Sequence, residues 1–178
     1  MSIFSADDDR ALHIGAADTA VALEGTGPAA YLDIAAIVAA ARGAGCDAVA
    51  PGYGFLSENA DFAEACAAAG LTFVGPDAET LRRFGDKILA KRIARDAGAP
   101  VLSGDELGDV AASTAYMQSL PPGSAVMVKA AAGGGGRGIR LVRDPADLSA
   151  AIAQCSAEAE AAFGSGAVLV ERYVPRAR

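Results

Sequence analysis

Short apolar runs alternate with helix-like segments in the first half of the chain, and this alternation constrains the fold most. Three segments have the composition of strands: 20–23, 46–50 and 71–74. Apolar residues recur at helical spacing between them, over 34–41 behind the N-cap candidate Asp33 and over 62–69. Such alternation is typical of a parallel sheet with crossover helices. We therefore expect an α/β domain with one βαβ unit across residues 20–50, after which the pattern repeats.

The pattern changes after Gly75-Pro76, where we expect a connector of two helices over 77–97 that is split at Gly85. Further elements are expected in this order: a helix over 110–120, strands over 125–130 and 139–142, a helix capped by Asp144 with Pro145 at its first position, and a strand over 168–171. A glycine-rich loop joins the two middle strands, which predicts an antiparallel pair. We divide the chain into domains at 1–84 and 85–178.

Both ends of the sequence suggest missing neighbours. Only Ile3-Phe4 precedes an acidic loop, so we expect a further strand and helix to open the first sheet. The strands after residue 125 lack partners that would complete a second sheet. The chain is therefore expected to be an incomplete piece of a longer protein.

Composition excludes several classes of protein. No apolar run approaches the roughly 18 residues that cross a bilayer, and the N-terminus lacks the pattern of a secretory signal, so we expect a cytoplasmic protein without a membrane partner. The net charge of -7 and pI near 4.6 argue against nucleic acid, which needs a basic surface. Three cysteines lie among apolar residues and are expected to pack in the core: Cys46, Cys66 and Cys155.

The segment from Lys129 to Gly138 carries the clearest chemical signal. Four consecutive glycines leave backbone amides free to surround phosphate oxygens, and Lys129 and Arg137 add positive charge. The alternative is a flexible hairpin tip. No Gly-Lys-Ser/Thr follows, so this is not a Walker A loop, and the late position of the glycines argues against a dinucleotide-binding βαβ unit. Lys87 and Glu171 are weaker candidates that would pass, taken alone, as a surface lysine and a strand-end carboxylate.

Four motifs together resemble biotin carboxylases, the ATP-grasp enzymes found within acyl-CoA carboxylases and pyruvate carboxylase. They occur in the family's order at 51–59 (Pro-Gly-Tyr-Gly-Phe-Leu-Ser-Glu-Asn), 85–87, 129–138 and 171–173. The resemblance covers nearly the whole chain. It implies a partial Rossmann-like domain followed by the start of an ATP-grasp domain with a glycine-rich lid.

The resemblance also implies roles for particular residues. Lys87 and Lys129 match residues that contact ATP phosphates, and the lid matches Gly133, Gly134, Gly135, Gly136, Arg137 and Gly138. Glu171 matches the acceptor of the adenine amino group, and the adenine pocket is lined by the backbone of Arg172, Tyr173 and Val174. Tyr53 and Gly54 match residues near the biotin site. No residue of this chain is expected to ligate a metal, and the catalytic residues are expected in absent sequence.

The reaction implied is phosphorylation of bicarbonate by ATP, with Mg²⁺ or Mn²⁺, and transfer of CO₂ to biotin on a carrier protein. A carboxyltransferase would be a further partner, and a homodimer is expected at full length. Two departures stand out: Ala50 replaces the usual His before the turn, and Arg172 replaces a frequent Lys. Another ATP-grasp ligase and a truncated, non-catalytic paralogue are the alternatives. We expect the isolated chain to bind nucleotide weakly at most and not to turn it over.

Overall fold

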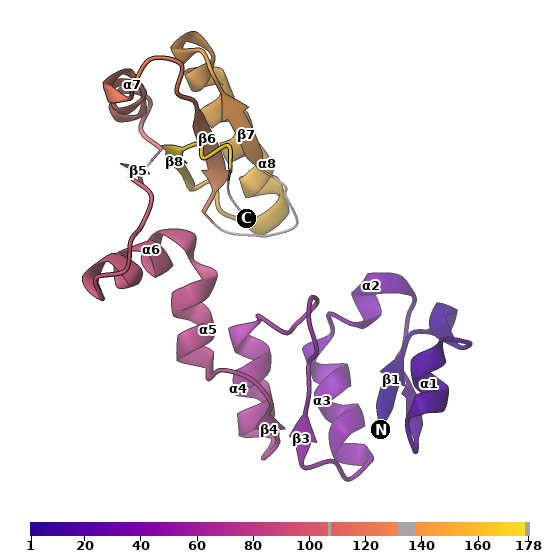
Figure 1. Cartoon of the computed structure of the whole chain (residues 1–178). Coiled ribbons are helices and arrows are strands. Elements are labelled where there is room, and N and C mark those ends of the chain that lie inside the picture. The colour runs from indigo at the N-terminus through magenta and orange to yellow at the C-terminus, as the bar shows by residue number, and fades with distance from the viewer. Residues whose placement is uncertain (107, 132–137, 177–178) are drawn as a thin grey trace. The chain divides into compact units, whose positions relative to one another are not determined.

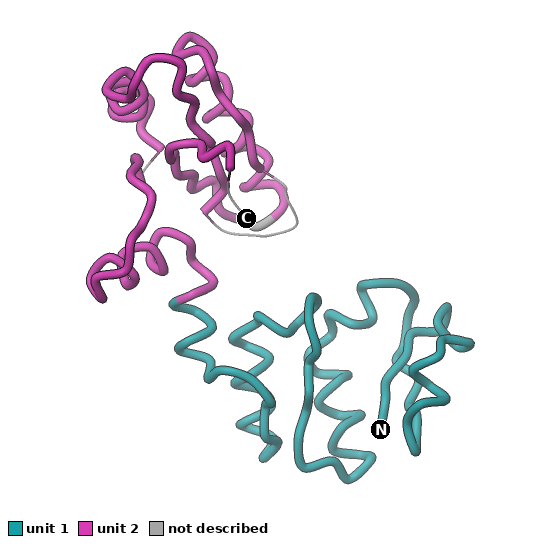
Figure 2. Tube along the Cα trace, viewed as in Figure 1, with its two compact units in different colours: residues 1–83 teal, residues 84–178 magenta. Residues whose placement is uncertain are grey.

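The computed structural model describes residues 1–106, 108–131 and 138–176, which form two compact units. Unit 1 comprises residues 1–83 and unit 2 residues 84–178, coloured separately in Figure 2. Figure 1 labels the helices and strands of both units. Each unit has a hydrophobic core of its own.

Unit 1 contains two small parallel sheets. Strand β1 (Ser2–Phe4) pairs with β2 (Ala20–Ala22), and β3 (Ala48–Val49) pairs with β4 (Thr72–Phe73). The helices of this unit are the 3-10 helix η1 (Ala6–Asp8), α1 (Leu12–Ala16), α2 (Gly27–Ala30), α3 (Ile34–Gly43), α4 (Ala60–Ala68) and most of α5 (Ala78–Gly85). The parallel α/β class is confirmed.

The predicted βαβ unit across residues 20–50 was wrong in its pairing. Its two strands, β2 and β3, belong to different sheets, and each pairs instead with a neighbour across α1 or α4. A cavity of about 540 Å³ is lined by residues of both β1 and β3, among them Ile3 and Val49. The two strand edges therefore flank open space, and helical spacing in the sequence could not reveal which strands are hydrogen-bonded neighbours.

The core of unit 1 follows the predicted helix faces. Ile37 and Ala41 of α3 pack with Phe62 and Cys66 of α4, and Phe62 also meets Phe73 edge-to-face. Asp33 caps α3 as expected, accepting from the amide of Ala36. The two helices thus bury one apolar stripe each, which is the arrangement that their spacing predicted.

Unit 2 is built on an antiparallel sheet in the order β5-β8-β6-β7. Its elements are α6 (Lys87–Asp96), β5 (Gly104–Asp105), α7 (Val110–Ser119), β6 (Val126–Ala130), β7 (Ile139–Val142), the 3-10 helix η2 (Pro145–Asp147), α8 (Leu148–Phe163) and β8 (Val168–Arg172). The predicted antiparallel pair is confirmed by β6 and β7. Asp144 caps the short helix η2, and α8 begins only at Leu148, so the expected helix start at Pro145 needs this correction.

Alternation along β6 and β8 gives the sheet of unit 2 two different faces. Val126, Val128 and Val170 are fully buried, and they share a core with Leu148 and Cys155 of α8. The intervening residues of both strands point to the opposite face. Helix α8 therefore covers one face, and Lys129 and Glu171 belong to the opposite face.

Two expectations from composition can be compared with the structure. Among the described residues, no helix is long and apolar enough to cross a membrane. Cys66 and Cys155 are fully buried, as expected, and all three cysteines are free thiols. Cys46 is only partly buried, although it packs against the core of unit 1.

Candidate functional site

The polar face of the sheet brings Lys129 and Glu171 together. In the antiparallel register Lys129 lies opposite Leu169, and Glu171 lies opposite Met127. The two charged residues are therefore diagonal neighbours on one face, within reach of a long side chain. Lys129 donates to Oε1 of Glu171, forming an ion pair.

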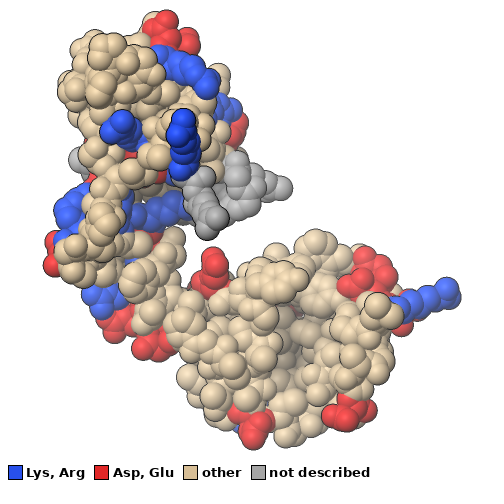
Figure 3. All heavy atoms as spheres, viewed as in Figure 1, with Lys and Arg blue, Asp and Glu red and all other residues tan. Residues whose placement is uncertain are grey.

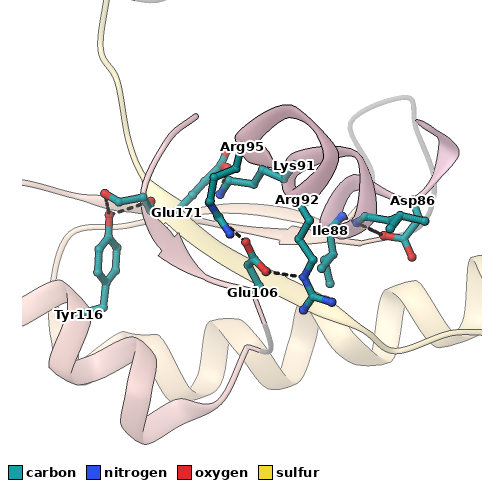
Figure 4. Close-up of polar contacts among 10 residues, drawn as sticks. Asp86, Ile88, Lys91, Arg92, Arg95, Glu106, Tyr116 and Glu171 are labelled. Atoms are coloured by element: carbon teal, nitrogen blue, oxygen red, sulfur yellow. Dashed lines mark hydrogen bonds and ion pairs between the residues drawn. The ribbon is translucent and has the colours of Figure 1, made fainter. Parts of the chain in front are cut away.

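Helix α6 adds two more lysines to this site. Asp86 caps the helix by accepting from the amides of Ile88 and Leu89, at 2.8 and 3.0 Å (Figure 4). This cap makes Lys87 the first helical residue, and Lys91 follows one turn later on the same face. Lys91 Nζ lies 3.3 Å from Oε2 of Glu171.

Lys87 is tied to the end of strand β6. Its Nζ donates to the carbonyl oxygen of Ala131 at 3.2 Å, and its backbone amide donates to the same oxygen at 3.4 Å. Ala131 stands two residues before Gly133, the first residue of the predicted lid. The helix start is thereby placed beside the entry to the predicted lid.

Two arginines fasten α6 to the segment around β5. Arg92 Nε and Arg95 Nη2 each contact the carboxylate of Glu106, at 2.8 and 2.6 Å (Figure 4). Glu106 is 15% exposed, while the arginines are about half exposed. Hydrogen bonds from both arginines lower the pKa of Glu106, so the carboxylate is ionised at neutral pH. This clamp fixes the helix that carries Lys87 and Lys91.

A cavity of about 310 Å³ collects these groups. Its charged residues are Lys87, Lys91, Lys129 and Glu171, and its apolar wall is formed by Phe84, Ala90, Val101, Leu102 and Leu169. With every group ionised, three positive charges face one negative charge. The cavity therefore suits an anion that also carries an apolar or aromatic part.

Glu171 remains an anion although it is buried. Its side chain is 10% exposed, and burial alone would raise its pKa. The hydrogen bonds and charges of Lys129 and Lys91 outweigh that effect and hold the pKa of Glu171 below its usual value. The carboxylate thus accepts hydrogen bonds through both oxygens.

The sequence contains three lysines in all, and every one of them lines this cavity. The other 12 of its 15 basic residues are arginines. Charge is also divided between the units: residues 1–83 hold 4 basic and 12 acidic residues, and residues 84–178 hold 11 basic and 10 acidic ones. Figure 3 shows basic side chains gathered on unit 2. The net acidity of the chain is therefore carried by unit 1.

The structure groups three of the residues predicted for nucleotide binding, Lys87, Lys129 and Glu171. Of the predicted lid, Gly133 to Arg137 lie outside the described residues. Gly138 has a φ of 65°, open to glycine, and its carbonyl accepts from the amide of Ala130 at 2.8 Å.

The residues after Glu171 continue the sheet. The Arg172 amide donates to Ser103 and the Tyr173 amide to Ala125, at 3.3 and 2.9 Å. Arg172 pairs with Val126, so its side chain lies on the face opposite to Glu171. Val174 is exposed. These two amides are hydrogen-bonded to neighbouring segments. A base could therefore contact only the remaining backbone groups of residues 172–174.

Tyr53 and Gly54 lie in unit 1, in the turn after β3. Tyr53 is 95% exposed, and Gly52 and Gly54 have φ values of 66° and 75°. Even Phe55 has a positive φ of 44°, and its ring contacts Tyr31. The turn therefore displays Tyr53 to solvent, with its glycines in conformations that most residues avoid.

Sequence reasoning missed Lys91 and the Glu106 clamp. Lys91 follows Lys87 by four residues, so helical periodicity was a signal that could have found it. Glu106 carried no such signal, because its arginine partners precede it by 14 and 11 residues across a turn. Within the described part of the chain, no three His, Cys, Asp or Glu side chains are placed to hold a metal ion.

Comparison with known protein families decides the affiliation of the chain. Residues 1–81 match the family described as "Biotin carboxylase, N-terminal domain", and residues 86–178 match "Carbamoyl-phosphate synthase L chain, ATP binding domain". The chain belongs to the biotin carboxylase family. Biotin carboxylase from Haemophilus influenzae is 42% identical over 182 residues, and the alpha subunit of mitochondrial methylcrotonoyl-CoA carboxylase from Oryza sativa is 42% identical over 180.

The chain spans only part of these relatives. All of it is covered in both matches, but it corresponds to 40% of the Haemophilus protein and 24% of the Oryza one. Among solved structures, the biotin carboxylase–β-γ-ATP complex from Campylobacter jejuni is similar, with a TM-score of 0.89 and 40% identity over 97% of this chain and 39% of that one. The family resemblance expected from the motifs is confirmed.

Proposed function

We propose that this chain supplies the nucleotide-binding part of an ATP-dependent biotin carboxylase. The observation that carries the proposal is the cavity where all three lysines of the sequence meet Glu171 beside an apolar wall. A triphosphate needs such concentrated positive charge, and a purine needs apolar surface and a polar acceptor. Two solved relatives support the assignment: the Campylobacter protein is an ATP complex, and the Hydrogenobacter thermophilus 2-oxoglutarate carboxylase domain is a dimer with MgADP and bicarbonate.

In the proposed reaction, ATP phosphorylates bicarbonate, and the resulting carboxyphosphate delivers CO₂ to biotin on a carrier protein. Phosphoryl transfer depends mainly on positioning and on neutralising charge. Lys87 and Lys129 would neutralise phosphate oxygens, and Glu171 would accept from the adenine amino group. The segment 133–138 would cover the phosphates, and the backbone of 172–174 would line the adenine pocket. Tyr53 and Gly54 would lie near biotin.

The proposal also covers the partners, assembly, location and domains of the enzyme. A carrier protein and a carboxyltransferase would be partners, the full-length enzyme would form a homodimer, and its location would be the cytoplasm. Residues 1–84 and 85–178 would act as two domains. Mg²⁺ or Mn²⁺ would accompany the nucleotide, but the described residues do not fit a metal site, since the one carboxylate of the cavity is engaged by two lysines. We therefore assign no step of this chain to the metal.

Calorimetric titration of ATP into the 178-residue chain tests the assignment. Lys129→Ala and Lys87→Ala should each weaken ATP binding at least about tenfold, because a charge-assisted hydrogen bond contributes roughly 1.5–3 kcal/mol. Arg143→Ala is the matched control: it removes an exposed cation that lies outside the cavity. Equal affinity of all four proteins, or no binding of ATP by the unaltered chain, would refute the assignment.

A phosphate-release assay addresses turnover separately. The isolated chain should release no phosphate from ATP with bicarbonate, biotin and excess Mg²⁺, because the described residues bring no three His, Cys, Asp or Glu side chains together to hold a metal, and Glu171 is already engaged by two lysines. Bicarbonate-stimulated release that disappears in Lys129→Ala would show instead that the chain is catalytically complete.

A further inference from the structure

Lys91 is the one lysine of the cavity that the proposed reaction does not use. Of the two lysines that contact Glu171, Lys91 is the more buried: its side chain is 12% exposed, against 31% for the side chain of Lys129. The two ammonium groups engage different oxygens, Lys91 at Oε2 and Lys129 at Oε1. This division of the carboxylate suggests that the two lysines have different tasks.

We propose that Lys91 is a positioning residue that sets the preference for adenine, by holding Glu171 ionised and oriented when Lys129 turns to the phosphates. The inference rests on the proposed function and deepens it. It assigns to Lys91 an effect on the base of the nucleotide, whereas Lys87 and Lys129 act on the phosphates.

The phosphates of a nucleotide would compete with Glu171 for Lys129. A triphosphate carries several negative charges, and Lys129 is the more exposed of the two lysines around Glu171, so it is the one that can leave. If it leaves, Oε1 of Glu171 loses its hydrogen-bond donor. Lys91 keeps its contact with Oε2, so the buried carboxylate retains one positive neighbour and its ionised state.

Oε1 of Glu171, once free of Lys129, then determines which base the site prefers. Oε1 can accept an N–H of the adenine amino group, which replaces the lost bond to Lys129. Inosine carries a carbonyl oxygen in place of that amino group, and two acceptors facing each other in a buried site repel and stay unpaired. Sites built to hydrogen-bond a substrate group discriminate strongly against an analogue without it. ATP should therefore be preferred over ITP only while Glu171 is anionic and fixed.

Without Lys91 this arrangement fails in one of two ways. Either Glu171 retains Lys129, which weakens phosphate binding, or the carboxylate loses both cations and takes up a proton in its buried position. A protonated Glu171 could donate to the inosine carbonyl, so discrimination would be lost. While Lys129 stays bound to Glu171, Oε1 cannot accept from the adenine amino group, so both routes lower the ratio of ATP affinity to ITP affinity, and this ratio reports on the base.

The inference is tested by measuring the dissociation constants for ATP and for ITP by calorimetry on the full 178-residue chain. The unaltered chain should prefer ATP at least about tenfold. Lys91→Met should reduce that preference at least about fivefold, and Lys91→Arg, which keeps the charge, should retain most of it. Glu171→Gln combined with Lys91→Met should change the preference by less than the product of the single effects, because both act through one carboxylate.

Three results would overturn the inference. Equal weakening of ATP and ITP in Lys91→Met would make Lys91 another phosphate ligand. An unchanged preference in a protein that melts earlier would make it a structural residue. Multiplicative effects in the double variant would separate Lys91 from Glu171. If Lys91→Met is unfolded by circular dichroism, Lys91→Gln provides the same comparison. Failure of the unaltered chain to bind either nucleotide would instead refute the proposed function.

Discussion

Replacing Gly104 by alanine should disturb the edge of the sheet that carries Glu171. Gly104 lies opposite Glu171 where β5 pairs with β8. A Cβ atom at this position would lie 2.1 Å from the carbonyl oxygen of Val170 and 2.8 Å from Cα of Glu171. Both are backbone atoms, which cannot rotate away as a side chain can. Strand β5 must therefore move away from β8, and such overpacking typically costs about 1–3 kcal/mol.

For a unit of this size, about 1 kcal/mol corresponds to roughly 4–8 °C in melting temperature. We expect Gly104→Ala to lower the melting temperature of unit 2 by at least about 4 °C, followed by circular dichroism, and to weaken ATP binding because Glu171 is displaced. Gly85→Ala is the matched control, since its Cβ would meet no described atom within 4 Å. The steric argument is refuted if Gly104→Ala melts within a degree of the unaltered protein, or if the control loses as much stability.

Two further predictions concern ionisation and thiol reactivity. Arg92 and Arg95 hold the pKa of Glu106 below its ordinary 4.5, so this clamp stabilises the fold above about pH 4.5 and its contribution is lost as pH falls further. Glu106→Gln should therefore lower the melting temperature by a few degrees at pH 7 and less at pH 3; an equal loss at both would contradict an ionic clamp. In a thiol titration Cys46, the only partly exposed cysteine, should react well before the two buried ones, and simultaneous reaction of all three would contradict this.

Much of the fold could be predicted because local signals were strong. Gly85 separates α5 from α6, and Asp86 directly after it caps the second helix through its side chain. The short apolar run over 125–130 predicted β6 as a strand, and in the structure its residues alternate between buried and half-buried. These features depend on neighbouring residues, so they are visible in the sequence itself.

Elements without an apolar pattern could not be predicted in the same way. Helix α1 has no buried residue, and its Leu12 is 94% exposed. The sequence therefore contains no amphipathic pattern that would predict this helix. Strand β5 consists of Gly104 and Asp105 alone and exists because β8 offers it a hydrogen-bonding edge. The pairing of β1 with β2 likewise depends on contacts between distant residues.

The candidate site was predicted in part because the family resemblance named Lys87, Lys129 and Glu171. The structure brings these three residues together in one cavity. Lys91 shows what such reasoning leaves out. It lies one helical turn after Lys87, and two like charges at this spacing destabilise a helix by about 0.2–0.5 kcal/mol. A chain that uses arginine for 12 of its 15 basic residues places its only other lysine on the sheet that this helix faces. The repulsion is offset by Glu171 in the structure, and a cavity lined by every lysine of the sequence suits an anionic ligand. The scarcity of lysine in this sequence is therefore itself a signal, and it indicates Lys91 as clearly as the glycine loop indicates Lys129.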